Sequence, residues 1–229
     1  SPAEDATHRS DETSHRVRLT KAFEMQATEV TQLQYFLVMG SNPSHWVAKD
    51  ACDPGNHRVI GKDNLCMHHP VEFLTWRQVD EFIRRLNKLQ RKYTYRLPTE
   101  AEWEYVARAG SMTQRPFAGS LDIVSDYDAY AWHYEDSAWH THLAWSKLPN
   151  PRGFYGMYGN VSEFVGDFYQ DFSAEDATDP KGPAKGDLRV LRGASCYTEP
   201  DKIRLAERNH FSIPERSYNV GLRLVRTKR

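Results

Sequence analysis

Apolar residues recur at helical spacing in three stretches of the first half of the chain. After Thr75 they return every three or four positions, as on one face of an amphipathic helix. Shorter stretches follow Thr31 and Thr99, and each of these threonines has Gln or Glu three positions later, as in a capping box. We therefore predict three helices, the first ending at Gly40 and the third at Gly110. Their apolar faces comprise Leu33, Phe36 and Leu37; Trp76, Val79, Phe82, Ile83, Leu86 and Leu89; and Trp103, Val106 and Ala107.

Strand-like stretches are short and scattered. Residues 17–19 and 23–25 near the start, and residues 190–192 and 221–225 near the end, have the pattern of strands. Between residue 110 and the end of the chain, Gly, Pro and aromatic residues are frequent, and no amphipathic stretch exceeds two helical turns. The pattern indicates an α+β chain forming one loop-rich domain over residues 1–229, with a polar, exposed lead-in over residues 1–16. A loop-rich half of this length needs buried aromatic rings, metal ions or disulfides to stay rigid.

Composition narrows the functional classes. The chain has 229 residues, with 30 Lys and Arg against 31 Asp and Glu, so its formal net charge is −1. A near-neutral chain is a poor candidate for binding nucleic acid, and no long apolar run predicts membrane insertion. Hydrophobic residues at 39% and aromatic residues at 12% exclude a disordered chain. The cysteine count of three leaves at least one thiol without a partner in the chain.

Several short motifs occur in a fixed order: EVTQLQY at 29–35, PVE at 70–72 before TW at 75–76, RLPTEAEWEY at 96–105, GNVSEF at 159–164, RVLRGAS at 189–195 and GLRL at 221–224. In order and spacing they resemble the sulfatase-modifying-factor superfamily, whose best-known member is the formylglycine-generating enzyme. The resemblance implies an α+β fold related to the C-type lectins, with a small twisted antiparallel sheet and two main helices. It also implies that a further N-terminal strand precedes residue 1.

The chemistry of the best-known family member does not carry over to this sequence. Formylglycine generation uses copper(I) held by two cysteines just after an Arg-Gly-Gly-Ser phrase. Here the matching segment, residues 192–204, contains a single cysteine, Cys196. Thr198 stands where a copper-binding thiolate is expected. We therefore expect no copper, and also no iron, because the H-x3-H-x-E pattern of related sulfoxide synthases is absent. Cys196 is either a lone reactive thiol or a small buried residue, and the lack of a neighbouring His favours the second.

Cys52 and Cys66 flank an irregular stretch that precedes Pro70. A disulfide between them would stabilise this stretch by roughly 3 kcal/mol through loop entropy. Many bacterial proteins that resemble this chain carry a cysteine pair in this place, and a disulfide would indicate the periplasm or the cell exterior. The alternatives are a zinc site that adds His68 and His69, and two free thiols.

Structural calcium is a further implication of the resemblance. In one implied site Gly156 stands where a side-chain oxygen is expected, so this site has one ligand too few. In the second implied site the acidic ligand is Asp136, and the alternative is that Asp136 is an ordinary solvated carboxylate in a turn. The implied ligands are Glu163 with the carbonyls of Gly159 and Val161, and Asp136 with the carbonyls of Ala131 and Ala138.

Other residues could line a binding site. His140 and His142 lie two apart and would face the same way on a strand, either as metal ligands or bonded to local backbone. The frequent aromatic residues form either core or the wall of a binding cleft, and the nearby arginines either pin loops or line that cleft. The candidate cleft residues are Trp132, Trp139, Arg192, Arg204 and Arg208.

These observations favour a bacterial, envelope-located pseudoenzyme that acts as a binding or accessory module and not as an oxidase. Its partner would be a protein, a peptide or a small molecule. One alternative is a diverged periplasmic enzyme for oxidative maturation of a peptide-derived metabolite, as in siderophore pathways. Another is a lectin-like receptor for glycans or proteins, by analogy of fold alone.

Overall fold

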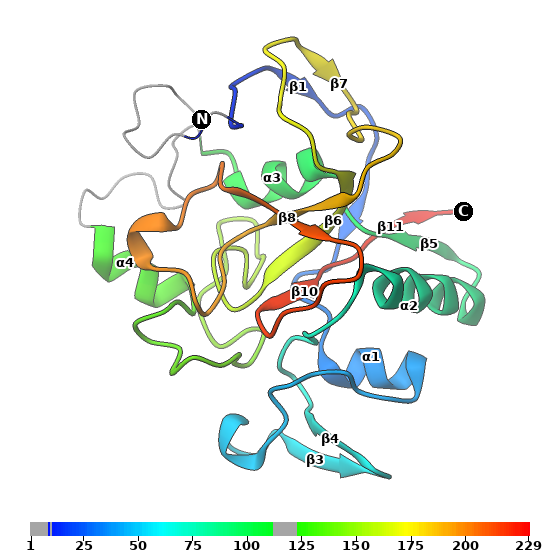
Figure 1. The fold of residues 1–229 in the computed structure, drawn as a ribbon, viewed down its shortest axis with the longest axis vertical. Coiled ribbons are helices and arrows are strands. Elements are labelled where there is room, and N and C mark those ends of the chain that lie inside the picture. The colour runs from blue at the N-terminus through cyan, green and yellow to red at the C-terminus, as the bar shows by residue number, and fades with distance from the viewer. Residues whose placement is uncertain (1–8, 10, 112–122) are drawn as a thin grey trace.

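The computed structural model describes residue 9, residues 11–111 and residues 123–229. These residues form four α-helices and eleven short β-strands (Figure 1). The helices are α1 (Gln32–Met39), α2 (Trp76–Leu89), α3 (Glu100–Arg108) and α4 (Ile123–Tyr130). The strands are β1 (Val17–Arg18), β2 (Glu24–Met25), β3 (His57–Ile60), β4 (Asp63–Cys66), β5 (Tyr93–Arg96), β6 (Ser162–Phe168), β7 (Ala177–Thr178), β8 (Leu188–Arg192), β9 (Arg208–Ser212), β10 (Val220–Leu222) and β11 (Val225–Lys228).

The described strands pair in small separate sheets. The central sheet has the order β10-β6-β8-β9, and a three-stranded sheet has the order β2-β11-β5. Strands β3 and β4 form a hairpin. The α+β class is confirmed, but two pairings, β10 with β6 and β1 with β7, are parallel and depart from the expected antiparallel sheet. Both join segments that are far apart in the sequence, where no tight turn imposes an antiparallel arrangement.

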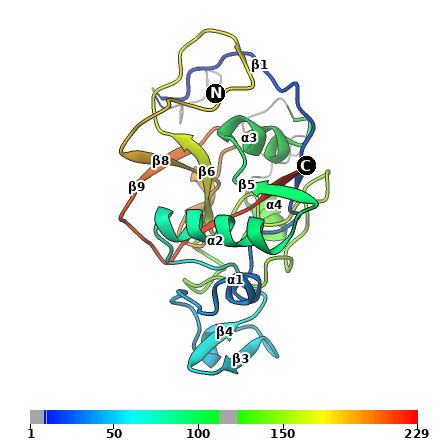
Figure 2. The same ribbon diagram turned by 90° about the vertical axis from the view of Figure 1, so that its right-hand side faces the viewer.

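The predicted helix starts are confirmed. Thr31, Thr75 and Thr99 are the N-caps of α1, α2 and α3, and each side chain accepts a hydrogen bond from the third helical N–H. Gly40 ends α1 with φ 76°. Helix α3 ends one residue before the predicted Gly110, because Ala109 already takes the left-handed conformation with φ 47°. Helix α2 lies beside α1 and β5 (Figure 2).

The core lies on both faces of the central sheet. Phe164 of β6 packs into one buried cluster, and its neighbour Val165 packs into the other. The same alternation places Leu191 and Val190 of β8 in opposite clusters. Strand β6 was not predicted, because a strand buried on both faces shows no alternation of apolar and polar residues.

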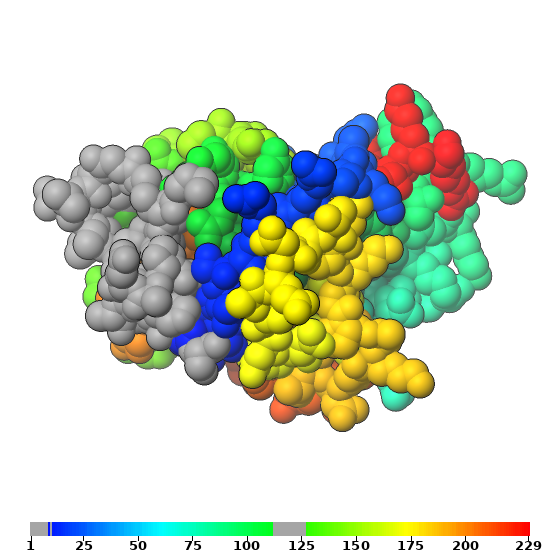
Figure 3. Space-filling model, turned by 90° about the horizontal axis from the view of Figure 1, so that it is seen from above, coloured from blue at the N-terminus to red at the C-terminus, as the bar shows by residue number. Residues whose placement is uncertain are grey.

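The N-terminal segment is bound to the body of the protein. Its residues lie beside the loop that contains β7, at residues 170–182 (Figure 3), and β1 pairs with β7. Glu12 is 2% exposed and forms an ion pair with Arg204 at 2.6 Å, so the expected exposed lead-in is wrong for this residue. Within the described parts of the chain, no helix is long and apolar enough to cross a lipid bilayer.

Candidate functional site

The segment after β8 carries Cys196 into the interior. Cys196 is fully buried, its N–H donates to the Asn160 carbonyl at 2.9 Å, and its own carbonyl accepts from the Ser137 hydroxyl at 2.8 Å. Burial raises the pKa of the thiol to about 12. The thiol is therefore protonated at neutral pH and is a poor nucleophile and a poor metal ligand. The Thr198 hydroxyl, at the position implied for a copper thiolate, accepts from the Ser195 N–H at 3.0 Å.

A buried carboxylate lies close to this thiol. Glu72 is 0% exposed, and negative charge on it would add to the effect of burial in raising the pKa of Cys196. Its Oε1 accepts from the Trp46 N–H at 2.9 Å, whereas its Oε2 has no hydrogen-bond partner among the described residues. Burial raises the pKa of Glu72 to about 8. Sequence reasoning missed this group, although an acidic residue inside the run Pro70-Val71-Glu72-Phe73-Leu74 is an unusual signal.

Around Cys196 and Glu72, aromatic side chains from several loops meet at the protein surface. The Tyr218 ring centroid lies 4.1 Å from that of His45 and 4.8 Å from that of Phe73. The Trp139 ring lies 4.5 Å from Tyr134. Trp139 is 53% exposed and Tyr218 is 40% exposed. We call this set the aromatic surface: His45, Trp46, Phe73, Tyr134, Trp139, His140, Tyr197 and Tyr218.

Two rings of the aromatic surface stand on strained backbone. Phe73 has φ 61° and Trp139 has φ 68°, and the residue before Trp139, Ala138, has φ 49°. Bulky residues rarely take the left-handed conformation, and such strain concentrates at functional sites. The fold therefore holds both rings in place at a cost in conformational energy.

The five predicted cleft residues are not brought together. Trp139 belongs to the aromatic surface, whereas Trp132 stacks on His142 at 3.9 Å and donates from Nε1 to Ser146 at 2.8 Å. Arg192, Arg204 and Arg208 are buried elsewhere, in ion pairs beneath the N-terminal segment.

These three arginines mainly form ion pairs and hydrogen bonds that join segments distant in sequence. Arg208 binds Glu100 through two hydrogen bonds of 2.6 and 2.9 Å, and Arg192 donates to Glu104 at 2.6 Å. Arg208 also donates to the Asp11 carbonyl at 2.9 Å. Of the three predicted arginines, only Arg208 lines the cavity of about 1020 Å³ between the N-terminal segment and α3.

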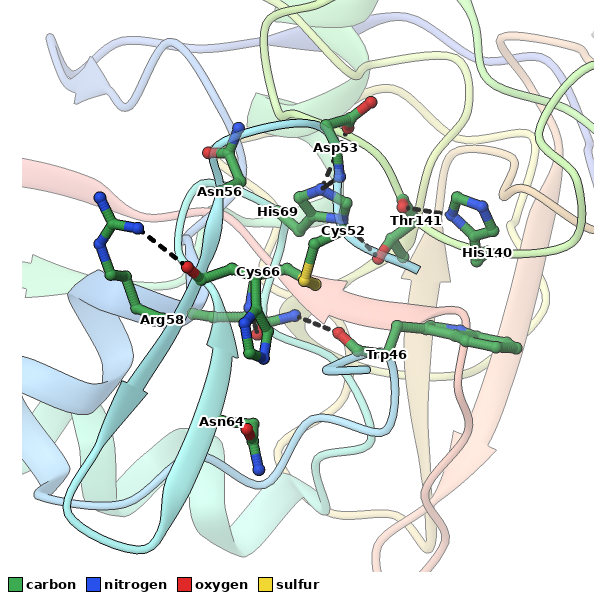
Figure 4. Close-up of a disulfide and its surroundings, with 12 residues drawn as sticks. Trp46, Cys52, Asp53, Asn56, Arg58, Asn64, Cys66, His69, His140 and Thr141 are labelled. Carbon is green, nitrogen blue, oxygen red and sulfur yellow. Dashed lines mark hydrogen bonds and ion pairs between the residues drawn. A yellow bond between two sulfur atoms is a disulfide. The ribbon is translucent and has the colours of Figure 1, made fainter. Parts of the chain in front are cut away.

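The disulfide prediction is confirmed. Cys52 and Cys66 are joined with their Cα atoms 5.1 Å apart (Figure 4). The zinc alternative is wrong, because both sulfurs are used in the bond and His69 instead contacts the Asp53 carboxylate at 3.0 Å. A disulfide indicates an oxidising compartment outside the cytoplasm.

His140 and His142 bond to local backbone, which was the alternative to a role as metal ligands. His140 Nδ1 donates to the Thr141 carbonyl at 2.8 Å, and His142 Nε2 donates to the Ser137 carbonyl at 2.8 Å. The remaining His142 nitrogen, Nδ1, lies 3.6 Å from the Asp53 carboxylate. This contact and the His69 hydrogen bond keep the pKa of Asp53 well below its usual range.

Glu163, an implied calcium ligand, is fully buried beside a second carboxylate. Its oxygens accept from Trp103 Nε1 at 2.7 Å and from Arg223 at 2.8 Å. Glu29 is also 0% exposed, and its Oε1 lies 2.2 Å from where a Cβ on Gly156 would stand. Its Oε2 finds no hydrogen-bond partner in the described structure, and burial raises its pKa to about 8. Glu29 thus brings a carboxylate to the place where position 156 lacks a side-chain oxygen.

The other implied calcium ligand, Asp136, is already paired with a cation of the chain. Its Oδ2 accepts from Lys147 Nζ at 2.5 Å. Ala131 is buried at the end of α4, and Ala138 lies in the turn before Trp139. Neither Glu29 nor Lys147 could be assigned from sequence, because each acts on residues that only the fold brings near.

Comparisons with known proteins agree with the fold and its motifs. A family model described as a sulfatase-modifying factor enzyme 1-like domain matches residues 3–228. A formylglycine-generating enzyme of Streptomyces coelicolor is 32% identical over 179 residues, which cover 72% of this chain and 54% of that protein. A Chlamydia pneumoniae protein named serine/threonine-protein kinase pkn1 is 34% identical over 162 residues, which cover 69% of this chain and 24% of that protein. The chain therefore spans about half or less of the length of these two relatives.

Solved structures show the same architecture over most of the chain. Treponema denticola variable protein 1 superposes with a TM-score of 0.79 at 30% identity, covering 92% of this chain and 86% of that one. PvdO from Pseudomonas aeruginosa superposes with a TM-score of 0.80 at 26% identity, covering 98% and 88%. With the motifs and the family model in agreement, the chain belongs to the family of sulfatase-modifying factor enzyme 1-like domains.

Proposed function

We propose that this chain is a binding or accessory module that has lost formylglycine-generating chemistry and binds a peptide segment of a partner on its aromatic surface. The observation that carries the proposal is the contrast between the buried thiol of Cys196 and the exposed rings of the aromatic surface. The thiol of Cys196 is fully buried and its pKa is raised to about 12, while Trp139 and Tyr218 of the aromatic surface are exposed.

The aromatic surface has the chemistry of a recognition site. Large rings such as Trp139 and Tyr218 release much ordered water when a ligand covers them, and their rigid side chains lose little entropy. Strained backbone fixes Phe73 and Trp139 before any ligand arrives, which lowers the cost of binding. The Arg216 guanidinium lies 4.3 Å from the centroid of the Phe73 ring, so a cation of this chain already covers one face of that ring.

Peptide display tests the proposed site. The disulfide-bonded protein is used to select peptides from a displayed library, and their affinities are measured by calorimetry. We expect Trp139→Ala and Tyr218→Ala to weaken binding at least 10-fold, as loss of a central aromatic contact does. Tyr105→Ala is the matched control, because Tyr105 is 48% exposed but lies on α3. Equal affinities for all four proteins would contradict the proposal.

Copper titration tests the loss of oxidase chemistry. The protein with its disulfide intact is titrated with copper(I) against a chromogenic chelator, and oxygen uptake is followed with a cysteine-containing peptide. We expect neither stoichiometric copper binding nor oxygen uptake, since one buried thiol cannot supply two thiolates. Tight binding that disappears in Cys196→Ser would refute the expectation.

The disulfide leads us to place the protein in the bacterial periplasm or outside the cell.

A diverged enzyme for oxidative maturation needs a reactive group beside a cleft, and the buried Cys196 gives it little support. A lectin-like receptor is favoured only if a glycan array shows calcium-dependent binding.

We further propose that a structural calcium ion is held by Glu29 and the carbonyls of Gly159 and Val161, and by Glu163, whose oxygens accept from Trp103 and Arg223 in this structure and would give up part of that bonding to the ion. Glu29 Oε2 is fully buried, has no hydrogen-bond partner among the described residues and lies 4.0 Å from Arg223 Nη2, so a hard cation bonded to it would reduce its remaining desolvation cost. When bound, the ion would supply positive charge that fixes the turn before β6. Calorimetric titration with calcium chloride should show binding that Glu29→Gln abolishes and that the control Glu81→Gln retains.

A further inference from the structure

The loop between α4 and Lys147 gathers the donor set of a cation site. Asp128, His133 and Asp136 each offer one ligand atom, and these atoms lie within 4.8 Å of one another. His133 is 0% exposed and contacts the Asp128 carboxylate at 2.7 Å through Nε2. Two carboxylates this close repel each other unless positive charge lies between or beside them.

The chain supplies that positive charge itself. Lys147 Nζ donates to Asp136 Oδ2 and to the backbone carbonyl of Asp128, both at 2.5 Å. It also lies 3.9 Å from the centroid of the Trp132 ring, within the range of a cation–π contact. The Lys147 side chain is 16% exposed, so the ammonium is largely removed from water.

The position of the ammonium also suits the helix end. The Asp128 carbonyl belongs to the last turn of α4, where the free carbonyls give the helix its negative end. The second Asp136 oxygen, Oδ1, accepts from the His133 N–H at 2.8 Å. Both carboxylate oxygens of Asp136 and the nearby carbonyl are thus in use, whereas calcium needs six to eight free oxygen ligands.

We propose that the ammonium of Lys147 is the built-in cation of this loop and takes the place of a calcium ion at Asp136. Calcium could reach Asp136 only by displacing the ammonium, because two cations cannot share one carboxylate oxygen and one carbonyl at this distance. The loop that carries Trp139 is therefore ordered without calcium.

The consequence for recognition rests on the proposed function. The same loop is joined to the Cys196 segment, since the Tyr134 N–H donates to the Thr198 carbonyl at 3.0 Å. Peptide binding on the aromatic surface should therefore not depend on calcium bound at Asp136. Unfolding temperatures test the role of Lys147 directly, and their outcome does not depend on whether a peptide binds.

The first test compares unfolding temperatures in EGTA and in millimolar calcium chloride. We expect Asp136→Asn to show the same calcium-induced shift as the wild type, within about 1 °C, because any bound calcium lies elsewhere. A wild-type shift that Asp136→Asn abolishes would overturn the proposal.

The second test removes the ammonium. Lys147→Met keeps the apolar stem over Trp132, and we expect it to lower the unfolding temperature by roughly 5 °C in EGTA, as expected for a partly buried carboxylate left without its partner. Calcium chloride should restore part of this loss, because the vacated place can accept a metal ion. Lys202→Met is the matched control, since Lys202 pairs with Glu199 but is 65% exposed, and its shift should stay within about 1 °C.

The double variant Lys147→Met with Asp136→Asn gives an independent readout. Removing both charges should cost clearly less than the sum of the two single changes if the groups are coupled. Equal shifts in Lys147→Met and Lys202→Met, or full additivity in the double variant, would overturn the proposal.

Discussion

Glu72→Gln perturbs one buried carboxyl while preserving its shape. Glu72 is 0% exposed, and its Oε1 accepts from the Trp46 N–H at 2.9 Å. A glutamine oxygen can accept the same hydrogen bond, but the glutamine side chain cannot ionise. The substitution therefore isolates the effect of charge at this position, apart from a constant cost of the buried amide N–H groups.

The expected magnitude follows from the pKa of Glu72, which burial raises from 4.5 to about 8. This difference corresponds to roughly 5 kcal/mol between the neutral and the fully ionised carboxyl. Because the folded protein holds the proton more tightly, the contribution is fully present below about pH 4.5 and is lost as the pH rises through 8. Relaxation of the folded state and entry of water reduce the effect, so we expect a change of about 2 to 5 kcal/mol.

Urea unfolding of the disulfide-bonded protein at pH 5 and pH 9 measures this change through tryptophan fluorescence. The free energy of unfolding of wild type should fall relative to that of Glu72→Gln between these pH values. Glu81→Gln is the control, because Glu81 is only partly buried and its arginine partners hold its pKa at about 2, so its profile should run parallel to wild type. If the Glu72→Gln profile also runs parallel, within about 0.5 kcal/mol, the assignment of a buried neutral carboxyl is refuted.

Four further predictions concern the disulfide, the Cys196 thiol, the cap of α3 and the buried His69. Replacing Cys52 and Cys66 with serine should lower the free energy of unfolding by roughly 3 kcal/mol in urea, and an unchanged midpoint would contradict the role of the disulfide. Native Cys196 should resist iodoacetamide and react only at the rate of unfolding, so rapid labelling of folded protein would show that the thiol is accessible. Thr99→Ala should cost about 1 kcal/mol through loss of the α3 cap, measured by the same urea assay. Burial lowers the pKa of His69, so stability should fall as the pH drops below about 6.5, and His69→Gln should flatten that part of the profile.

Features that depend on neighbours in sequence were predictable. The caps at Thr31, Thr75 and Thr99 each join a side chain to a backbone N–H three residues later, so local spacing is enough to locate them. The family motifs are likewise local phrases, and they predicted the α+β class before any contact was known. Of the sites, the Cys52–Cys66 disulfide was found for a related reason, since its two cysteines are only 14 residues apart, in a stretch predicted to be irregular that the structure shows to contain the β3–β4 hairpin.

Strand β6 shows where local reasoning ends. Its Phe164 and Val165 face two different buried clusters, so the strand has no polar face to reveal its period. Its acidic residues also concealed it, because the buried Glu163 is held by Trp103 and Arg223, which lie 60 residues before and after it in the chain. Sequence alone gives such a carboxylate the appearance of an exposed loop residue.

The sequence by itself determined the starts of α1, α2 and α3, the family and the lack of a second thiol beside Cys196, because each depends on residue identity and short spacing. The tertiary structure alone decided which charges are paired and which rings are exposed. Lys147 pairs with Asp136 eleven residues before it, and the Glu29 carboxyl reaches Gly156, only in the folded chain. The free energy of a charge or a ring depends on its distance to other groups and to water, and folding sets those distances.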